Sequence, residues 1–404
     1  MAAKVAEDIV RLAWLSGGKR ARLFIALAVF SFTASVTADS AGAGQDGVTE
    51  SAADAAEVPA PPAPHALFYR GRDYGSESLH GPISVFLNRG YDVLQLRPGE
   101  RNVFQQSYGA DGRVVLRNLA NPIPAIADDG FGRFFRTEIF PLSFTPDTAY
   151  WVPNYTLHLI GGGMTFRALS EWFEAHRFPL ARLWSGAVIM ASALVNETLE
   201  NKRNTGFNTD AIADVYFFDL GGMALFSIDT VARFFSEEVR VMDWSLQPAF
   251  TFPTGNLNNE GNYFAVKWPL PFYRRLSPFV HMGLGSLGGL SYRVGEYSVS
   301  AAAGWRSYRL TNRSRTELRN NVSFAPSAGV FIDRNDSLLA SLRISNVEDN
   351  VVELNLFPNS FWHSNPGIGS WYIVGKHGEF LAGLSVAGTF EFGIGYERPV
   401  HAAH

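Results

Sequence analysis

The 404-residue sequence predicts a multi-domain α plus β protein, in which a buried helical module precedes an antiparallel transmembrane β-barrel. Three observations favour this fold class. Apolar and small or polar residues alternate with period two from about residue 242 to 399, and the period shifts towards that of a helix between residues 150 and 238. The first 64 residues have the composition of a leader followed by a linker.

Composition excludes several classes of protein. The chain has no cysteine, so it has no disulfide, no thiolate metal site, no cysteine nucleophile and no lipidated N-terminal cysteine. A net charge of −4 argues against a general nucleic-acid-binding protein, which needs a concentrated basic surface. The 38 glycines and 32 phenylalanines accompany only 18% charged residues, and abundant Phe does not fit a disordered chain.

The N-terminus has the organisation of a signal peptide. A cationic cluster at residues 19–22 precedes an apolar run from Leu23 to about Val36, which is shorter than a membrane-spanning helix. We therefore predict a signal peptide over residues 1–38, cleaved before Asp39; the alternative is an uncleaved anchor. A disordered linker rich in Pro and Ala follows over residues 39–66.

Residues 241–400 are expected to form the barrel. One run illustrates the pattern: Tyr297, Val299, Ala301, Ala303 and Trp305 alternate with Ser298, Ser300, Ala302, Gly304 and Arg306. About ten such runs, many with aromatic ends, indicate about ten strands, within a range of eight to twelve. The apolar residues would face lipid and the small or polar ones the lumen. A soluble β-sandwich or ligand-binding barrel is the alternative, because apolar and polar residues also alternate along its strands.

The preceding chain divides into an irregular segment with short helices (67–150) and the helical module (151–240). Helices are expected over residues 165–175, from Pro179 through the uncharged run 183–195, and over residues 210–235 with Thr209 as N-cap. The run 183–195 is apolar around its whole circumference, so we expect it to be buried. The triplet at residues 161–163 is a glycine break that allows close approach of chain segments.

Five residues of the helical module are candidates for a catalytic or a metal site: His158, Glu197, Glu200, Asp210 and Asp214. The first acidic pair is spaced i,i+3 and the second i,i+4, so each pair shares a helix face. If the intervening loop folds the two helices into an antiparallel pair, the carboxylates converge near the histidine. Such a cluster suits a divalent cation, or an acid with a raised pKa beside a charged partner.

The alternative is a structural network in which Arg167, Lys202, Arg203 and backbone donors satisfy these acids. The spacing matches neither a zinc-protease HExxH motif nor a Ser–His–Asp signature. The triplet 161–163 lacks the GxGxxG spacing of a nucleotide-binding loop, so no cofactor other than a divalent cation is predicted.

Several motifs carry a resemblance to known families. They are Asn88-Arg89, Asn118-Leu119, the segment 128–131, the segment 154–158, the triplet 161–163, the segment 196–200, the segment 208–214 and Gly221-Gly222. With these motifs, the chain resembles an uncharacterised family of Gram-negative envelope proteins in which a helical core precedes a barrel-like C-terminal region. Residues 80–235 are also distantly similar to the VanZ-like group. The resemblance implies no known activity.

The sequence therefore predicts an outer-membrane β-barrel protein of a Gram-negative bacterium with a periplasmic or lumen-filling helical domain. A structural, transport or lipid-handling role is expected, with membrane lipid and the barrel-insertion machinery as partners and no nucleic acid. The alternative is an envelope enzyme that acts on a lipid or lipid-linked phosphate through the five candidate residues. A third hypothesis, an adhesin or surface receptor, depends only on a long loop at residues 357–369.

Overall fold

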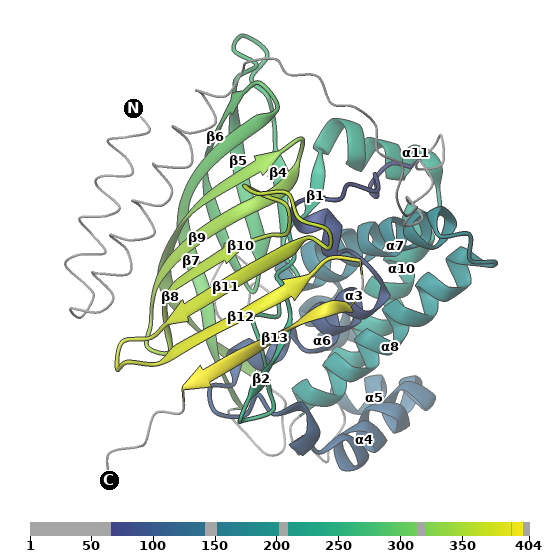
Figure 1. The fold of residues 1–404 in the computed structure, drawn as a ribbon. Helices are drawn as coiled ribbons and strands as arrows, with labels where there is room; N and C mark the ends of the chain where they lie inside the picture. Colours follow the sequence, from purple (N-terminus) through teal and green to yellow (C-terminus); the bar gives the residue numbers. More distant parts are fainter. Residues whose placement is uncertain (1–65, 142–151, 202–208, 313–319, 389, 399–404) are drawn as a thin grey trace, which may run out of the picture.

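The computed structural model describes residues 66–141, 152–201, 209–312, 320–388 and 390–398. Helices occupy the first half of this part and strands the second, which confirms the α plus β order. Figure 1 shows the helices gathered beside one side of a strongly curled sheet. The predicted leader and all but the last residue of the linker lie outside the described residues.

The helical half contains short elements before longer ones. The first group is η1 (Ser76–Leu79), α3 (Pro82–Gly90), η2 (Asp92–Leu96), η3 (Val103–Gln105), α4 (Tyr108–Ala120), α5 (Pro122–Asp129), α6 (Phe131–Phe134) and η4 (Phe135–Ile139). The second is η5 (Val152–Gly162), α7 (Gly163–Ala175), α8 (Ala181–Asn201), α9 (Asp210–Ile212), η6 (Ala213–Asp219), α10 (Leu220–Phe226), α11 (Asp229–Arg233) and η7 (Phe234–Val239). Segments η4 to η7 are π-helical.

The predicted helix over residues 165–175 is confirmed by α7, but the other two differ from expectation. Helix α8 begins at Ala181 rather than beside Pro179, and it is not buried all round, because Leu183 and Trp184 are exposed. The third helix is broken rather than continuous to residue 235. The Ser227 hydroxyl donates to the carbonyl of Met223, and the chain turns extended at residue 228 before α11 begins.

The prediction that Thr209 caps the third helix through its side chain is also wrong. Thr209 precedes α9, but its backbone is already helical and its side chain makes no capping hydrogen bond. A capping side chain needs an extended backbone to reach the N–H groups of the first turn. The carbonyl of Thr209 instead accepts a hydrogen bond from the N–H of Ala213.

The strand half forms one thirteen-stranded sheet within the described residues. Its strands are β1 (Val241–Asp243), β2 (Ala249–Phe252), β3 (Asn256–Asn258), β4 (Phe264–Lys267), β5 (Leu276–Gly283), β6 (Gly285–Val294), β7 (Tyr297–Asn312), β8 (Asn320–Arg334), β9 (Ser337–Val347), β10 (Asn350–Leu356), β11 (Ile368–Val374), β12 (Phe380–Val386) and β13 (Phe390–Arg398). Their order is β1-β4-β5-β6-β7-β8-β9-β10-β11-β12-β13-β2-β3. All neighbours are antiparallel except β13 and β2.

The predicted closed barrel of about ten strands is therefore wrong in two respects. The sheet is not closed into a barrel, since its order ends at β1 and β3, and it has more strands than the expected maximum of twelve. The extra strands arise because one hairpin is interrupted in both of its arms. Pro248, between β1 and β2, has no N–H to donate, and Gly261, between β3 and β4, adopts φ 156°.

The two ends of the strand order belong to that same hairpin. Between the paired segments, the N–H of Trp244 donates to the carbonyl of Tyr263 at 2.8 Å, and the N–H of Leu246 donates to Gly261 at 3.0 Å. Residues 241–252 thus face residues 256–267, with β1 beside β4 and β2 beside β3. This hairpin brings the first and last parts of the sheet together.

The period-two alternation is confirmed as a difference between the two faces of the sheet. On β7, Ser298, Ser300 and Arg306 are buried, whereas Tyr297 and Trp305 are exposed. The buried face is the concave one, against which the segment from α3 to η3 packs. Contacts to it include the hydrogen bond from the Tyr263 hydroxyl to Gln95 Oε1 at 3.0 Å and the bond from Asn102 Nδ2 to the Thr254 carbonyl at 2.8 Å.

Among the described residues, no single helix has the length and apolar composition to cross a membrane. One bent pair, Asp210–Phe226 with Asp229–Val239, has the required length and composition when its two halves are taken together, and the halves meet at 89°.

The glycine break predicted at residues 161–163 is a close helix contact in the structure. A Cβ on Gly163 would lie 2.6 Å from the carbonyl oxygen of Gly222, and a Cβ on Gly222 would lie 2.4 Å from the carbonyl oxygen of Leu159. Segment η5 and helix α10 therefore approach to a distance that only glycine permits. This contact holds η5, and with it His158, against η6.

We predict that Gly222→Ala destabilises the protein by about 2 kcal/mol, because backbone atoms block the added methyl group. Gly221→Ala is the matched control, since its Cβ would meet only a Leu159 methyl group at 3.4 Å. In the control, the gain in helix propensity offsets any cost. Chemical denaturation measures both variants, and equal destabilisation of the two would contradict the close contact.

Candidate functional site

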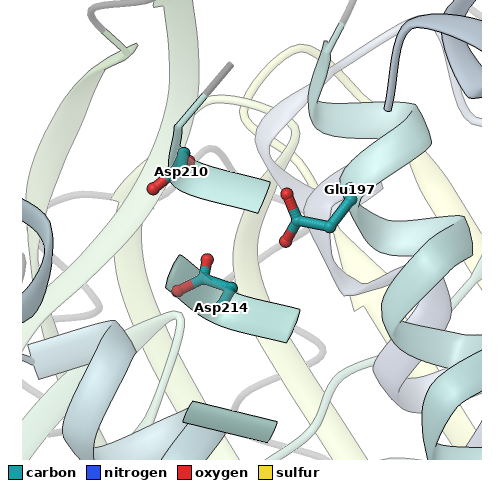
Figure 2. Close-up of side chains that lie close together, drawn as sticks. All are labelled: Glu197, Asp210 and Asp214. Carbon is teal, nitrogen blue, oxygen red and sulfur yellow. The ribbon is translucent and has the colours of Figure 1, made fainter. Parts of the chain in front are cut away.

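Three of the five candidate residues converge. Glu197 projects from α8, Asp210 opens α9 and Asp214 lies one turn later on η6, and Figure 2 shows their carboxylates turned towards one another. One carboxylate oxygen from each lies within 4.8 Å of one from each of the others. The i,i+4 spacing of the two aspartates puts both on the helix face that meets α8, as the sequence predicts.

His158 lies beside this cluster on η5. Its Nε2 is 3.8 Å from Asp214 Oδ2, and its Nδ1 is 3.4 Å from Asp219 Oδ1. Burial works to lower the pKa of His158, but the charge and hydrogen bond of Asp219 work to raise it, and the net shift is upward. The ring thus lies between two carboxylates, of which Asp219 favours its protonated form.

Sequence reasoning missed Arg89, which anchors the site from α3. Arg89 Nη2 donates to Asp219 Oδ1 at 2.7 Å, and both side chains are buried. A Cβ on Gly162 would lie 2.9 Å from Arg89 Nη1, so the glycine makes room for this pair. Burial works to raise the pKa of Asp219, but Arg89 and His158 outweigh it and hold the pKa below its usual value.

Two more acids of the site were also missed. Asp92, at the start of η2, accepts a hydrogen bond of 2.6 Å from Asn196 Nδ2, and burial raises its pKa to about 6. Burial and the nearby charge of Asp210 raise the pKa of Glu138, on η4, to about 8. The Asn88-Arg89 motif and the acid just before Gly221-Gly222 were visible signals for part of this set. Asp92 and Glu138 had none, because tertiary packing alone brings η2 and η4 to α8 and α9.

The converging acids carry unfavourable electrostatics. Burial and the charge of Asp210 raise the pKa of both Glu197 and Asp214 well above its ordinary value, and burial raises that of Asp210 itself. Two like charges at 4 to 5 Å repel by about 3 to 4 kcal/mol at an effective dielectric constant of 20. The cluster is thus stable only where protons or a cation balance its charge.

Glu200 lies near the cluster without belonging to the converging group. Burial and Asp210 raise its pKa to about 7, while Arg97 and His158 act in the opposite direction. The carbonyl of Glu200 accepts from Arg97 Nη2 at 3.4 Å. Glu200 lies one helical turn beyond Glu197, and its carboxyl group interacts electrostatically with Asp210 of the cluster.

Of the basic residues that the structural alternative names, Arg167 lies within the described residues and pairs with other acids. Arg167 bonds to Glu171 at 3.0 Å and to Asp229 at 2.7 Å, away from the cluster. Lys202 and Arg203 lie outside the described residues. Glu171 has a structural role, because its Oε2 accepts from the N–H groups of Phe68 and Tyr69 at 2.8 and 2.9 Å.

The arrangement offers defined chemistry. Buried carboxyls with raised pKa values donate protons near neutral pH, and a carboxylate-held histidine accepts or delivers one. The converging oxygens also form a donor set for a hard cation.

Comparison of this chain with protein-family models, with curated proteins and with solved structures finds no match. The family resemblance and the five-residue site stay predictions.

Substitution of paired and unpaired acids is expected to have opposite effects on stability. Asp219→Asn leaves the buried charge of Arg89 without its partner, and we predict a loss of about 3 kcal/mol. Glu197→Gln removes a like charge, so at pH 8 in EDTA it stabilises the protein by about 1 to 3 kcal/mol. Chemical denaturation of both variants measures this contrast, and a destabilised Glu197→Gln variant would contradict it.

The same cluster predicts how stability depends on pH. Because the folded-state pKa values of Glu197, Asp214 and Glu200 lie above their unfolded values, the folded protein binds more protons than the unfolded chain between these values. In EDTA, the contribution of these three acids to stability is therefore fully present below about pH 4, and the part due to Glu200 is lost as pH rises through about 7. The advantage of Glu197→Gln disappears at the acidic end. Melting temperatures between pH 4 and 8 measure this, and a flat profile would contradict it.

Proposed function

We propose that this chain is an outer-membrane protein of a Gram-negative envelope whose curled sheet is embedded in lipid, with the segment from α3 to η3 packed against its concave side. It reaches the membrane through a cleaved leader and the barrel-insertion machinery, and its role is anchoring or lipid handling. The observation that carries the proposal is the inverted polarity of the sheet: apolar residues point outward into contact with the surroundings, and charged residues point inward.

The outward face supports contact with lipid. Leu290 on β6, Trp305 on β7 and Ile394 on β13 are 53%, 58% and 62% exposed. Other exposed apolar side chains of this face are Tyr292, Val294, Tyr297, Val299, Phe324, Leu384, Phe390 and Tyr396. A soluble sheet buries its apolar face, whereas a membrane sheet turns that face to the acyl chains and places Tyr and Trp near the interfaces.

The inward face supports the same proposal. Glu353 on β10 bonds to Arg343 on β9 and, at 3.1 Å, to Arg306 on β7, and all three side chains are buried. Lys267 pairs with Asp333 at 2.6 Å on the same side. Charges that face away from the outer surface, and that pair with one another, are compatible with a surrounding bilayer.

A sheet in lipid also requires that few backbone groups stay unpaired. Each end of the strand order is only three residues long, namely β1 and β3. The edge of β3 is partly covered, because the N–H of Leu257 donates to the carbonyl of Arg101 at 3.0 Å and Asn256 forms a bridge with Asn102.

The packing of the concave side favours anchoring or lipid handling over a water-filled channel. Trp371 is fully buried there, and a Cβ on Gly383 or Gly395 would lie 2.5 or 2.9 Å from its ring. Tyr263 stacks on His281 with ring centroids 5.0 Å apart. The segment from α3 to η3 covers the same side.

Charge substitution on the outward face tests the proposal. Leu290→Arg and Ile394→Arg should each cost about 2 to 4 kcal/mol in a bilayer and reduce the amount of protein in the membrane fraction. Ile123→Arg is the control, because Ile123 is 62% exposed on α5, away from the sheet. The wild-type protein should also show heat-dependent mobility in gel electrophoresis.

Recovery of the wild-type protein in the aqueous fraction, without a mobility shift on heating, would contradict the lipid assignment. So would sheet variants that behave like Ile123→Arg, because an arginine on a water-exposed surface changes stability by less than about 0.5 kcal/mol.

A second candidate function is an envelope enzyme acting on a lipid or lipid-linked phosphate. The observation that favours it is the position of His158 between Asp214 and Asp219, which suits transfer of a proton to or from a substrate. His158→Gln should then abolish turnover of a lipid-linked phosphate in vesicles without loss of folded protein. Equal turnover by the variant and the wild type would remove this candidate.

A further inference from the structure

We propose that Glu197, Asp210 and Asp214 bind one hard divalent cation between the C-terminal end of α8 and the start of α9 and η6. The three carboxylates point towards one another from two elements that face each other (Figure 2). The proposal is independent of the assignment of the sheet to lipid.

The spacing of the oxygens agrees with a shared ion. Oxygens on opposite sides of a Ca²⁺ ion, at 2.3 to 2.6 Å from it, lie at most about 5 Å apart, and those around Mg²⁺ at most about 4.2 Å. The chosen oxygens of the three residues all lie within 4.8 Å of one another. The three oxygens are thus already near the spacing of Ca²⁺ ligands, and the smaller Mg²⁺ or Mn²⁺ fits after a contraction.

Carboxylate oxygens without a hydrogen-bond partner also support a bound cation at this place. Glu197 Oε2 and Asp214 Oδ1 are buried without a hydrogen-bond partner, in residues that are only 1% and 4% exposed. Within the described ranges, neither side chain forms an ion pair with a lysine or an arginine. Buried carboxylate oxygens normally have a partner, and a bound cation supplies one to both residues at once.

The chemistry of the donors selects the kind of ion. Three carboxylates and no thiolate form a hard donor set, which suits Mg²⁺, Ca²⁺ or Mn²⁺. His158 lies behind Asp214 with its Nε2 3.8 Å from Oδ2, where it orients the ligating carboxylate, and the pair of Arg89 with Asp219 fixes the ring from the other side.

The position of the site gives the ion a structural consequence. Glu197 belongs to α8, while Asp210 and Asp214 occupy successive turns of the next helical segment. A shared cation replaces the repulsion between these turns with attraction and joins the two segments. Binding therefore stabilises the folded protein in proportion to the ion concentration.

The test uses the full chain, purified in detergent and stripped with EDTA. Manganese binding, followed by electron paramagnetic resonance, should show one Mn²⁺ per chain. At 100 times the dissociation constant, Mn²⁺ or Ca²⁺ should raise the melting temperature by about 5 °C or more, while K⁺ at equal ionic strength should not. Glu197→Gln and Asp214→Asn should each weaken Mn²⁺ binding at least about tenfold.

Glu237→Gln is the matched control, because Glu237 is an exposed carboxylate on η7 that forms an ion pair with Arg233. It should bind Mn²⁺ as the wild type does. Circular dichroism and the melting temperature in EDTA establish that the variants fold. Absence of bound Mn²⁺ at millimolar concentration, unchanged affinity in Asp214→Asn, or an equal loss in Glu237→Gln would overturn the proposal.

Discussion

The helical module buries several carboxylates close together, and the packing of its helices depends on how their charge is balanced. Arg89 balances Asp219 directly, and His158 shares that balance. Glu197 and Asp214 have no basic ion partner beyond His158 in the described ranges, and their raised pKa values reflect this. A proton lowers the repulsion at acid pH, and the proposed divalent cation would lower it at neutral pH. The same geometry thus makes the module sensitive to both.

Two consecutive residues of α3 connect the acidic site to the sheet. Asn88 donates to the carbonyl of Leu246 at 3.1 Å and accepts from the N–H of Gly261 at 2.9 Å, both in the first hairpin. Arg89 points to Asp219. Successive side chains of a helix point about 100° apart, so one short helix contacts both parts. Helix α3 therefore joins the acidic site to the hairpin at the ends of the strand order.

The sequence predicted much of this architecture because local patterns determine it. Alternation on β7 depends only on which residues follow one another, and the structure places Ser298, Ser300 and Arg306 on the buried face as expected. That the sheet does not close into a barrel could not be predicted in the same way. The strand order depends on the pairing of β13 with β2, which is a long-range contact, and on the interruption of the hairpin near Pro248 and Gly261.

The candidate site shows the same division. Helical spacing brought Asp210 and Asp214 to one face, and the facing position of Glu197 followed from the antiparallel helices. Arg89 is more than a hundred residues from Asp219, so no spacing rule links them. Asp92 and Glu138 belong to short helical segments whose positions result from packing against α8 and η6.

The most direct measurement of the cation site is anomalous X-ray diffraction from crystals grown with Mn²⁺. We predict one anomalous peak between the carboxylates of Glu197, Asp210 and Asp214, within coordination distance of all three. A map with no peak at this point, or with a lysine or arginine side chain between the three carboxylates, would contradict it.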